Sequence, residues 1–322
     1  MFFRDFYMDK LERKKQYEAV IKTRRFLRKK YKLLYFMILP ALVFLFVFSY
    51  LPMYGVVFAF QDYNPRLGFA STFVGIKHFQ RLFTDMFFQR AFFNTLIINV
   101  YKLVFEFPSP IILALLINEI LRSSIKRVIQ TITYMPHFLS WVIVGGYLFS
   151  VLSPNDGIIA TLSQMLTGTK SDIYLMISSK HFRGIVVVSS IWKEVGWSSI
   201  IYMAAISSVD PTLYEAAVCD GAGKLRQLWN ITLPSIFPTI AVMLILRIGH
   251  MMGSDFEQLF VLANPTVYSV GDVIATYVYR VGLRGMAYSY GTAVGFTLSV
   301  IGFTLLATAN KLSKKFLQTN FW

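Results

Sequence analysis

The stretch Asp210-Pro-Thr-Leu-Tyr-Glu-Ala-Ala-Val-Cys-Asp-Gly-Ala-Gly-Lys-Leu-Arg-Gln-Leu-Trp-Asn-Ile-Thr-Leu-Pro234 is a polar insert of 25 residues between two strongly apolar segments. Its pattern predicts two short helices with a bend between them. Asp210 can cap the first helix, Pro211 suits the first helical position, and Gly221 allows the backbone to leave the helix. Pro234 then opens the next long apolar run, so the insert is expected to protrude from the apolar segments beside it.

The composition of the 322-residue chain is typical of an integral membrane protein. Hydrophobic residues make up 55% of the chain and charged residues only 15%, which is too apolar for a soluble globular domain. The net charge of +15 does not indicate a nucleic-acid partner, because 12 of the 32 basic residues lie in the first 32 positions and the long apolar runs would have no place in water. The single cysteine, Cys219, excludes an internal disulfide.

Six apolar runs are long enough to cross a membrane, since about 20 apolar residues span the hydrocarbon core. The sequence therefore predicts an all-α integral membrane fold with six transmembrane helices and a two-helix loop over residues 210–234. Residues 1–32 form a basic segment, either amphipathic along the inner leaflet or disordered, and residues 33–322 form the transmembrane domain. The expected spans are Leu33–Phe60, Ala91–Ile117 (interrupted by Pro108 and Pro110), Val128–Leu152, Phe182–Val209, Leu233–Gly253 and Ala287–Asn310.

The distribution of Lys and Arg predicts which loops face the cytoplasm, because positive residues are retained on that side. With both termini inside, the inner segments hold 20 basic residues and the outer loops hold 9. The two-helix loop then lies on the cytoplasmic face of the cell membrane, and the loops over residues 61–90, 153–183 and 254–286 lie outside.

Part of the insert resembles the EAA loop of binding-protein-dependent ABC import permeases. The match consists of Glu215-Ala216-Ala217, three residues, Gly221, nine residues and Ile231-x-Leu233-Pro234, without a gap. In that family the loop docks into a cleft on the ATPase subunit and passes on its movement. The resemblance implies that Glu215 contacts an Arg or Lys of the ATPase, that small residues permit close approach and that Gly221 sets the bend. The expected coupling residues are Glu215, Ala216, Ala217, Asp220, Gly221 and Ala222.

Other segments are similar to the oligosaccharide and polysaccharide branch of this family, and the resemblance covers roughly residues 91–310. It implies a helical bundle that pairs with a second permease around a central path. It also implies two ATPase subunits that hold ATP and Mg²⁺, and an extracytoplasmic substrate-binding protein received by the loops over residues 61–90 and 254–286. The segments are Tyr134-Met-Pro-His-Phe-Leu-Ser-Trp141, Trp192-Lys-Glu-Val-Gly-Trp197, Phe256-Glu-Gln-Leu-Phe260, Asn264-Pro265 and Asp272-Val-Ile-Ala-Thr-Tyr-Val-Tyr279.

A charge at membrane depth costs about 2.5 to 3.5 kcal/mol on insertion scales, so each one should face protein, water or an opposite charge. Lys102 and Glu106 are four residues apart on one helix face, where they can pair; a buried structural pair and a role in the substrate path both remain open. Lys193 and Glu194 point about 100° apart on a helix, so they are not expected to face the same partner. One of them is expected to face the path.

Three further residues are candidates for contact with a saccharide. Trp192 and Trp197 offer flat apolar faces with an indole donor, which suits a sugar ring, although aromatic packing within the bundle explains them as well. Arg247, toward the outer end of the fifth span, can bind a carboxylate through two hydrogen bonds; an acidic saccharide or an internal bridge to Asp or Glu would account for it. The expected path residues are Glu106, Trp192, Lys193, Glu194, Trp197 and Arg247.

The sequence shows no catalytic or metal-binding motif. The only Gly-Lys pair, Gly223-Lys224, lacks the rest of a P-loop, and no His-Glu-x-x-His, paired cysteines or Gly-x-Ser-x-Gly occurs. No catalytic residue, metal ligand or cofactor of its own is therefore expected, and the chain is predicted to be a permease subunit that moves an oligosaccharide by alternating access.

Two other classes of protein fit the sequence less well. An ion-coupled secondary transporter is the main alternative, but it predicts an internal inverted repeat, which is not evident, and leaves the polar insert unexplained. A membrane-bound enzyme or receptor would need a reactive constellation or a soluble domain, and neither is visible in the sequence.

Overall fold

The computed structural model describes residues 31–32, 34–154, 157–167, 174–253 and 255–317. The predicted basic segment, residues 1–32, lies almost wholly outside the described residues. The chain divides into two units, residues 1–57 and residues 58–322. The first unit contains most of the helix Leu34–Phe60, which passes through a π-helical turn η1 (Phe46–Tyr50) into a 3-10 segment η2 (Leu51–Phe60).

Five helices among the described residues are long and apolar enough to cross a membrane, or six if a bent pair of helices is counted as one span. Each overlaps one of the predicted spans, with ends that differ by up to nine residues. The helical integral membrane fold predicted from the sequence is thereby confirmed. The five helices are Leu34–Phe60, Met86–Asn118, Ser179–Ser207, Lys224–His250 and Tyr288–Lys311.

The third predicted span, Val128–Leu152, is not one straight helix. Helix α5 (Ser123–Tyr134) leads into a short 3-10 turn η5 (Met135–Phe138), and helix α6 (Trp141–Val151) then runs at 100° to them. The bend falls where Ser140 has extended backbone and accepts a hydrogen bond from the amide of Ile143, which starts a new helix. Hydropathy continues across the bend, so the apolar pattern could not predict it.

The second span continues past the two prolines that were expected to interrupt it. Helix α3 (Met86–Tyr101) passes through a π-helical turn η4 (Lys102–Glu106) into helix α4 (Pro108–Asn118). Pro108 and Pro110 stand in the first turn of α4, and the wider π-helical turn before them accommodates their missing amide donors.

Helix α8 (Ser179–Ser207) lies at the centre of the packing. Helices α4 and α5 pack along it, and α11 (Leu233–His250) joins it to α15 (Tyr288–Leu317). One buried cluster, Ala114, Tyr202, Ile206 and Ile236, connects α4, α8 and α11. A Cβ atom on Gly196 of α8 would lie 2.0 Å from the carbonyl oxygen of Thr133, so the close approach of α8 to α5 requires glycine.

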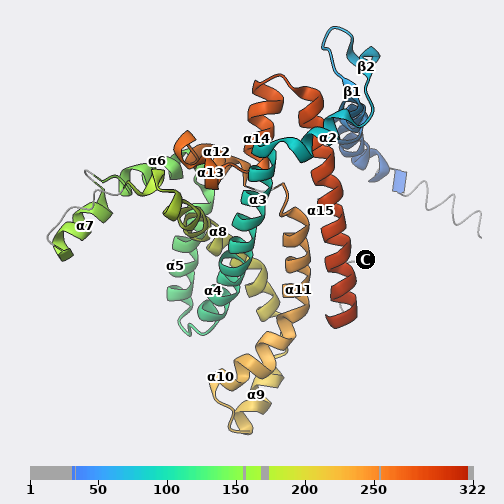
Figure 1. The fold of residues 1–322 in the computed structure, drawn as a ribbon. Coiled ribbons are helices and arrows are strands. Elements are labelled where there is room, and N and C mark those ends of the chain that lie inside the picture. Colours follow the sequence, from blue (N-terminus) through green and yellow to red (C-terminus); the bar gives the residue numbers. More distant parts are fainter. Residues whose placement is uncertain (1–30, 33, 155–156, 168–173, 254, 318–322) are drawn as a thin grey trace, which may run out of the picture. The chain divides into compact units, whose positions relative to one another are not determined.

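The second unit carries different structures at the two ends of α8 and α11 (Figure 1). Helices α9 (Pro211–Cys219) and α10 (Lys224–Gln227) lie at one end. The other end carries α2 (Lys77–Thr84), α12 (Phe256–Leu262), η8 (Pro265–Val267), α13 (Tyr268–Gly271), α14 (Ile274–Val278) and η9 (Tyr279–Arg284).

Five smaller elements also belong to the described part of this unit, among them the 3-10 turn η3 (Gly68–Ala70) between two short strands. The short strands β1 (Gln61–Asp62) and β2 (Thr72–Phe73) are antiparallel, with Gln61 opposite Phe73 and Asp62 opposite Thr72. Helix α7 (Ile158–Thr167) follows α6 in the chain, and the turn η6 (Leu175–Ile177) precedes α8.

Candidate functional site

A pocket of about 270 Å³ lies between η4, α4, α8 and α11. Three of the predicted path residues line it, Glu106, Glu194 and Arg247, which come from three different spans. Charged groups at membrane depth need water, protein or an opposite charge, and here they converge on a single cavity. The remaining lining residues are Phe107, Ser109, Pro110, Val195, Ser198, Tyr202, Met243, Leu246 and His250.

The carboxylate of Glu106 is approached from three helices. Ser190 Oγ of α8 donates to Glu106 Oε2 at 2.9 Å. Lys102 Nζ lies 3.8 Å from the same oxygen, and Arg247 Nη2 of α11 lies 3.4 Å from Oε1. The internal bridge expected as one explanation of Arg247 is thus present, together with the pair four residues apart on the second span.

Lys102 has closer partners than Glu106. Its side chain is 1% exposed, and Nζ donates to Asp255 Oδ1 and to Gln258 Oε1, both at 2.7 Å. Asp255 has a left-handed backbone (φ 76°) directly before α12, and Gln258 Nε2 in turn donates to the carbonyl oxygen of Val186 on α8 at 2.7 Å. Lys102 therefore fastens the start of α12 to the second span, a role that sequence spacing did not reveal.

Lys193 and Glu194 face the same partner, contrary to the prediction. Lys193 Nζ donates to the carbonyl oxygen of His137 at 2.7 Å and to Glu194 Oε1 at 3.2 Å, and Glu194 Oε2 lies 2.8 Å from His137 Nδ1. Both side chains are long enough to converge although their Cα–Cβ bonds diverge by about 100°. Two sequence segments that were singled out separately, residues 134–141 and 192–197, therefore meet at the bend of the third span.

Trp192 and Trp197 lie outside the set of residues that line this pocket. Both are about half exposed, at 50% and 45%. The Trp197 ring stacks on His137 with ring centroids 4.6 Å apart and planes 1° apart, which fits the packing explanation for this residue. Contact of either indole with a sugar stays a prediction.

The loop of α9 and α10 begins as the sequence predicts. Asp210 caps α9 by accepting a hydrogen bond from the amide of Thr212 at 2.9 Å, Pro211 is in the first turn, and Gly221 has φ +72°. The hydrogen bond from Thr212 holds the pKa of Asp210 below its ordinary value. Only glycine adopts the backbone at Gly221 without strain, so the bend depends on it.

The second half of this loop differs from the prediction. Helix α10 is not a separate short helix, because it continues through a π-helical turn η7 (Leu228–Thr232) into α11. Pro234 stands in the first turn of α11, inside the continuous helix Lys224–His250, where the wide turn before it tolerates a residue without an amide donor. The bend at Gly221 is therefore connected to the pocket by one unbroken helix.

The predicted coupling residues lie together on this loop. Glu215, Ala216, Asp220 and Gly221 are exposed, and Ala217 and Ala222 are half-buried. The Tyr214 hydroxyl lies 3.0 Å from Thr232 Oγ1 and joins α9 to η7.

Large apolar side chains are also exposed on and beside this loop. Val218 is 63% exposed, Leu225 76% and Trp229 67%. An exposed apolar surface of this kind is typical of a protein contact. Beside it lies a groove of about 500 Å³, lined in part by Leu121, Glu215 and Leu228.

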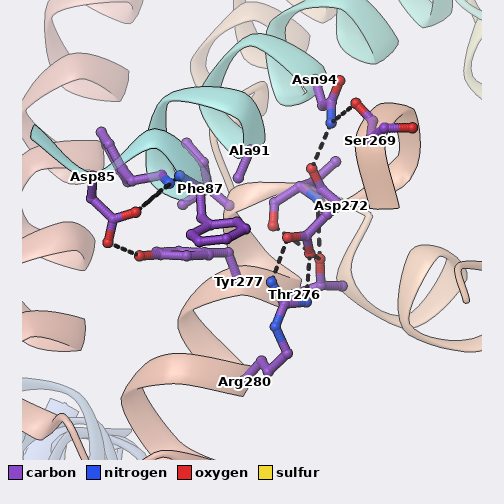
Figure 2. Close-up of polar contacts among 12 residues, drawn as sticks. Asp85, Phe87, Ala91, Asn94, Ser269, Asp272, Thr276, Tyr277 and Arg280 are labelled. Atoms are coloured by element: carbon purple, nitrogen blue, oxygen red, sulfur yellow. Dashed lines mark hydrogen bonds and ion pairs between the residues drawn. The ribbon is translucent and has the colours of Figure 1, made fainter. Parts of the chain in front are cut away.

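A polar network holds the opposite end together (Figure 2). Asn94 of α3 donates to the carbonyl oxygens of Ser269 and Asp272 at 3.2 and 3.1 Å. The Asp272 carboxylate accepts from Thr276 Oγ1 at 2.9 Å and from Arg280 at 3.0 and 2.6 Å. These contacts join the loop over residues 255–286 to the second span.

Asp85 makes a second link at this end (Figure 2). Its Oδ1 caps α3 by accepting from the amides of Phe87 and Phe88, and its Oδ2 accepts from the Tyr277 hydroxyl at 2.7 Å. Burial would raise the pKa of Asp85, but the hydrogen bonds from Tyr277 and from the two amides outweigh burial and lower it. The carboxylate is therefore charged where it joins α3 to α14.

Comparison with known proteins gives the family of the chain. The sequence model of the family described as "Binding-protein-dependent transport system inner membrane component" matches residues 107–317. The polygalacturonan/rhamnogalacturonan transport system permease protein YteP of Bacillus subtilis (strain 168) is 47% identical over 286 residues, which cover 88% of each chain.

Solved structures agree with this match. A chain from the crystal structure of a bacterial ABC transporter involved in the import of the acidic polysaccharide alginate has a TM-score of 0.83 and 40% identity, covering 90% of this chain and 97% of its own length. A structure of the bacterial alginate ABC transporter in complex with alginate pentasaccharide-bound periplasmic protein matches with the same TM-score and identity, over 91% of this chain and 98% of that one.

These relatives give no support to an ion-coupled transporter. The family match extends over α8, the loop of α9 and α10, and α11, which carries Arg247, and the related structures are chains of ABC importers. The chain belongs to the binding-protein-dependent transport system inner membrane components, and it is the membrane-embedded permease subunit of an ABC importer.

Proposed function

We propose that this permease translocates an acidic oligosaccharide, in which sugar rings carry carboxylates, by alternating access. The observation that carries the proposal is the position of Arg247, which lines a pocket between three spans. A charge at membrane depth is costly, so a cation at this place indicates a function. The names of its relatives support the same substrate class, since polygalacturonan and alginate are both acidic polymers.

The proposed assembly contains this chain, a second permease, two ATPase subunits and an extracytoplasmic substrate-binding protein. ATP and Mg²⁺ would bind on the ATPase subunits, because this sequence has no P-loop. The distribution of Lys and Arg supports an orientation with the loop of α9 and α10 and both termini in the cytoplasm. The apolar exposure of Val218, Leu225 and Trp229 supports docking of that loop on an ATPase, with Glu215 beside a basic residue.

The helices suggest how ATPase closure would reach the substrate. Helix α9 follows α8, and α10 is continuous with α11, so a push on the loop acts directly on two helices of the bundle. Those helices carry Glu194 and Arg247 into the pocket. Movement of α8 and α11 relative to α4 would then open the pocket to one side of the membrane and close it to the other.

Uptake by the complete importer in proteoliposomes tests the substrate class. The probes are an oligogalacturonate and its methyl ester, which has the same rings without the charge, and binding of each to the substrate-binding protein is measured separately. We expect uptake of the acidic probe to exceed uptake of the ester by more than the binding protein's own preference. Equal uptake after correction for binding would contradict the proposal.

A further inference from the structure

We infer that Arg247 and Glu106 form an exchangeable ion pair, in which a carboxylate of the substrate replaces Glu106 as the partner of Arg247. The exchange would take place in the pocket between η4, α4, α8 and α11. The inference rests on the proposed acidic substrate, and it identifies Arg247 as the residue that binds the substrate's carboxylate.

Arg247 is incompletely paired in the structure. Its Nη2 atom is buried and has no hydrogen-bond partner among the residues that the structure describes, although it lies 3.4 Å from Glu106 Oε1. A buried donor without a hydrogen bond is costly, so a group that accepts a hydrogen bond from Nη2 would stabilise the protein. The side chain is 27% exposed and lines the pocket, and a guanidinium can hold a carboxylate through two parallel hydrogen bonds.

Glu106 can release Arg247 without becoming an unpaired buried charge. Its Oε2 keeps the hydrogen bond from Ser190 at 2.9 Å and remains 3.8 Å from Lys102 Nζ. Neither contact involves Oε1, the oxygen beside Arg247. An incoming carboxylate would therefore replace one of three polar contacts of Glu106 and leave the other two in place.

Two other cations within the spans, Lys102 and Lys193, are already engaged. Lys102 is 1% exposed and donates to Asp255 and Gln258, both at 2.7 Å. Lys193 is 6% exposed and donates to His137 and Glu194. Of Lys102, Lys193 and Arg247, Arg247 is the one that both lines the pocket and has a buried donor without a hydrogen bond.

The remaining carboxylate of the pocket does not compete strongly for Arg247. Glu194 is 2.8 Å from His137 Nδ1 and 3.2 Å from Lys193 Nζ, so groups other than Arg247 already pair with its carboxylate. Glu106 is then the internal group that a substrate carboxylate must displace. Neutralising Glu106 is therefore expected to strengthen selection for a charged substrate, because it removes the internal partner of Arg247.

Two variants of the complete importer in proteoliposomes test the exchange. The measurement is uptake efficiency for an oligogalacturonate divided by that for its methyl ester, with one substrate-binding protein throughout, so that a change in the ratio belongs to the permease. Arg247→Gln should lower the ratio about tenfold or more, the worth of a charge-assisted hydrogen bond. Glu106→Gln keeps the Ser190 contact but frees Arg247, and it should raise the ratio. Arg127→Gln, on the exposed surface of α5, is the matched control and should leave it unchanged.

The outcomes separate this inference from the proposed function. A wild-type importer without preference for the acidic probe would overturn both. A wild-type preference that survives in Arg247→Gln would overturn the exchange alone. So would a Glu106→Gln variant that loses the preference as Arg247→Gln does, because a purely structural ion pair is disrupted equally by removing either of its two residues. If Arg247→Gln does not assemble, Arg247→Lys, which keeps the charge but not the paired donors, must still lower the ratio; an unchanged ratio would refute the inference.

Discussion

The loop of α9 and α10 and the loops of α12 to α14 lie at opposite ends of α8 and α11, and they use their side chains differently (Figure 1). On the first, Val218, Leu225 and Trp229 are exposed. At the second, charged groups such as Lys102 and Asp272 are buried and paired, Lys102 with Asp255 and Asp272 with Arg280. The difference indicates that one end is a surface for a moving partner, whereas the other is braced against the second span and keeps its shape.

The bracing is tested most severely at Lys102. Lys102→Met leaves Asp255 and Gln258 without their shared donor, and breaking a buried pair from one side typically costs about 3 to 5 kcal/mol. We expect the thermal unfolding of the purified permease to shift to markedly lower temperature.

Lys77→Met is the matched control for this change. Lys77 forms an ion pair of the same 2.7 Å length with Asp62, but its side chain is 62% exposed and solvent screens the interaction. It should leave the unfolding temperature nearly unchanged. Equal shifts in the two variants would mean that the buried contacts of Lys102 stabilise the protein no more than an exposed ion pair does.

A smaller effect is expected on the loop of α9 and α10, on transport rather than on stability. Gly221→Val forces a β-branched residue to φ +72°, a strain of about 1 to 2 kcal/mol, which lowers the population of the bent loop by roughly 5- to 30-fold. Uptake per ATP hydrolysed by the complete importer should fall, while membrane insertion of the chain stays normal.

Gly223→Ala provides the comparison on the same loop. Gly223 has φ −69°, and a Cβ there meets nothing within 4 Å, so this variant should couple as the wild type does. Normal transport by Gly221→Val would mean that the bend does not carry the coupling.

The two ends also differ in how far the sequence predicts them. Asp210, Pro211 and Gly221 act through neighbours in the chain, as cap, first-turn residue and bend, and each was predicted correctly. The sequence did not predict that α10 continues into α11. A π-helical turn has no strong compositional signal, and a proline such as Pro234 usually indicates the start of a new helix.

At the opposite end the contacts join distant positions, which spacing along one helix cannot reveal. Lys102 was paired with Glu106 by their four-residue separation, yet its shortest contacts are with Asp255 and Gln258, more than 150 residues away. His137 lay inside a segment that was singled out, but only folding brings it against Lys193 and Glu194. The three path residues Glu106, Glu194 and Arg247 were identified by the cost of charge in a membrane, and their meeting in one pocket needed the structure.

The assignment of the two ends to opposite sides of the membrane is tested by labelling Cys219. It is the single cysteine of the chain and is exposed on α9. A membrane-impermeant maleimide should label it in inverted membrane vesicles and not in intact cells, and assembly with the ATPase subunits should slow the reaction. Leu67→Cys in a Cys219→Ser background should give the reverse pattern, since Leu67 is exposed beside the β1 and β2 strands. Labelling of Cys219 from outside intact cells would contradict the account.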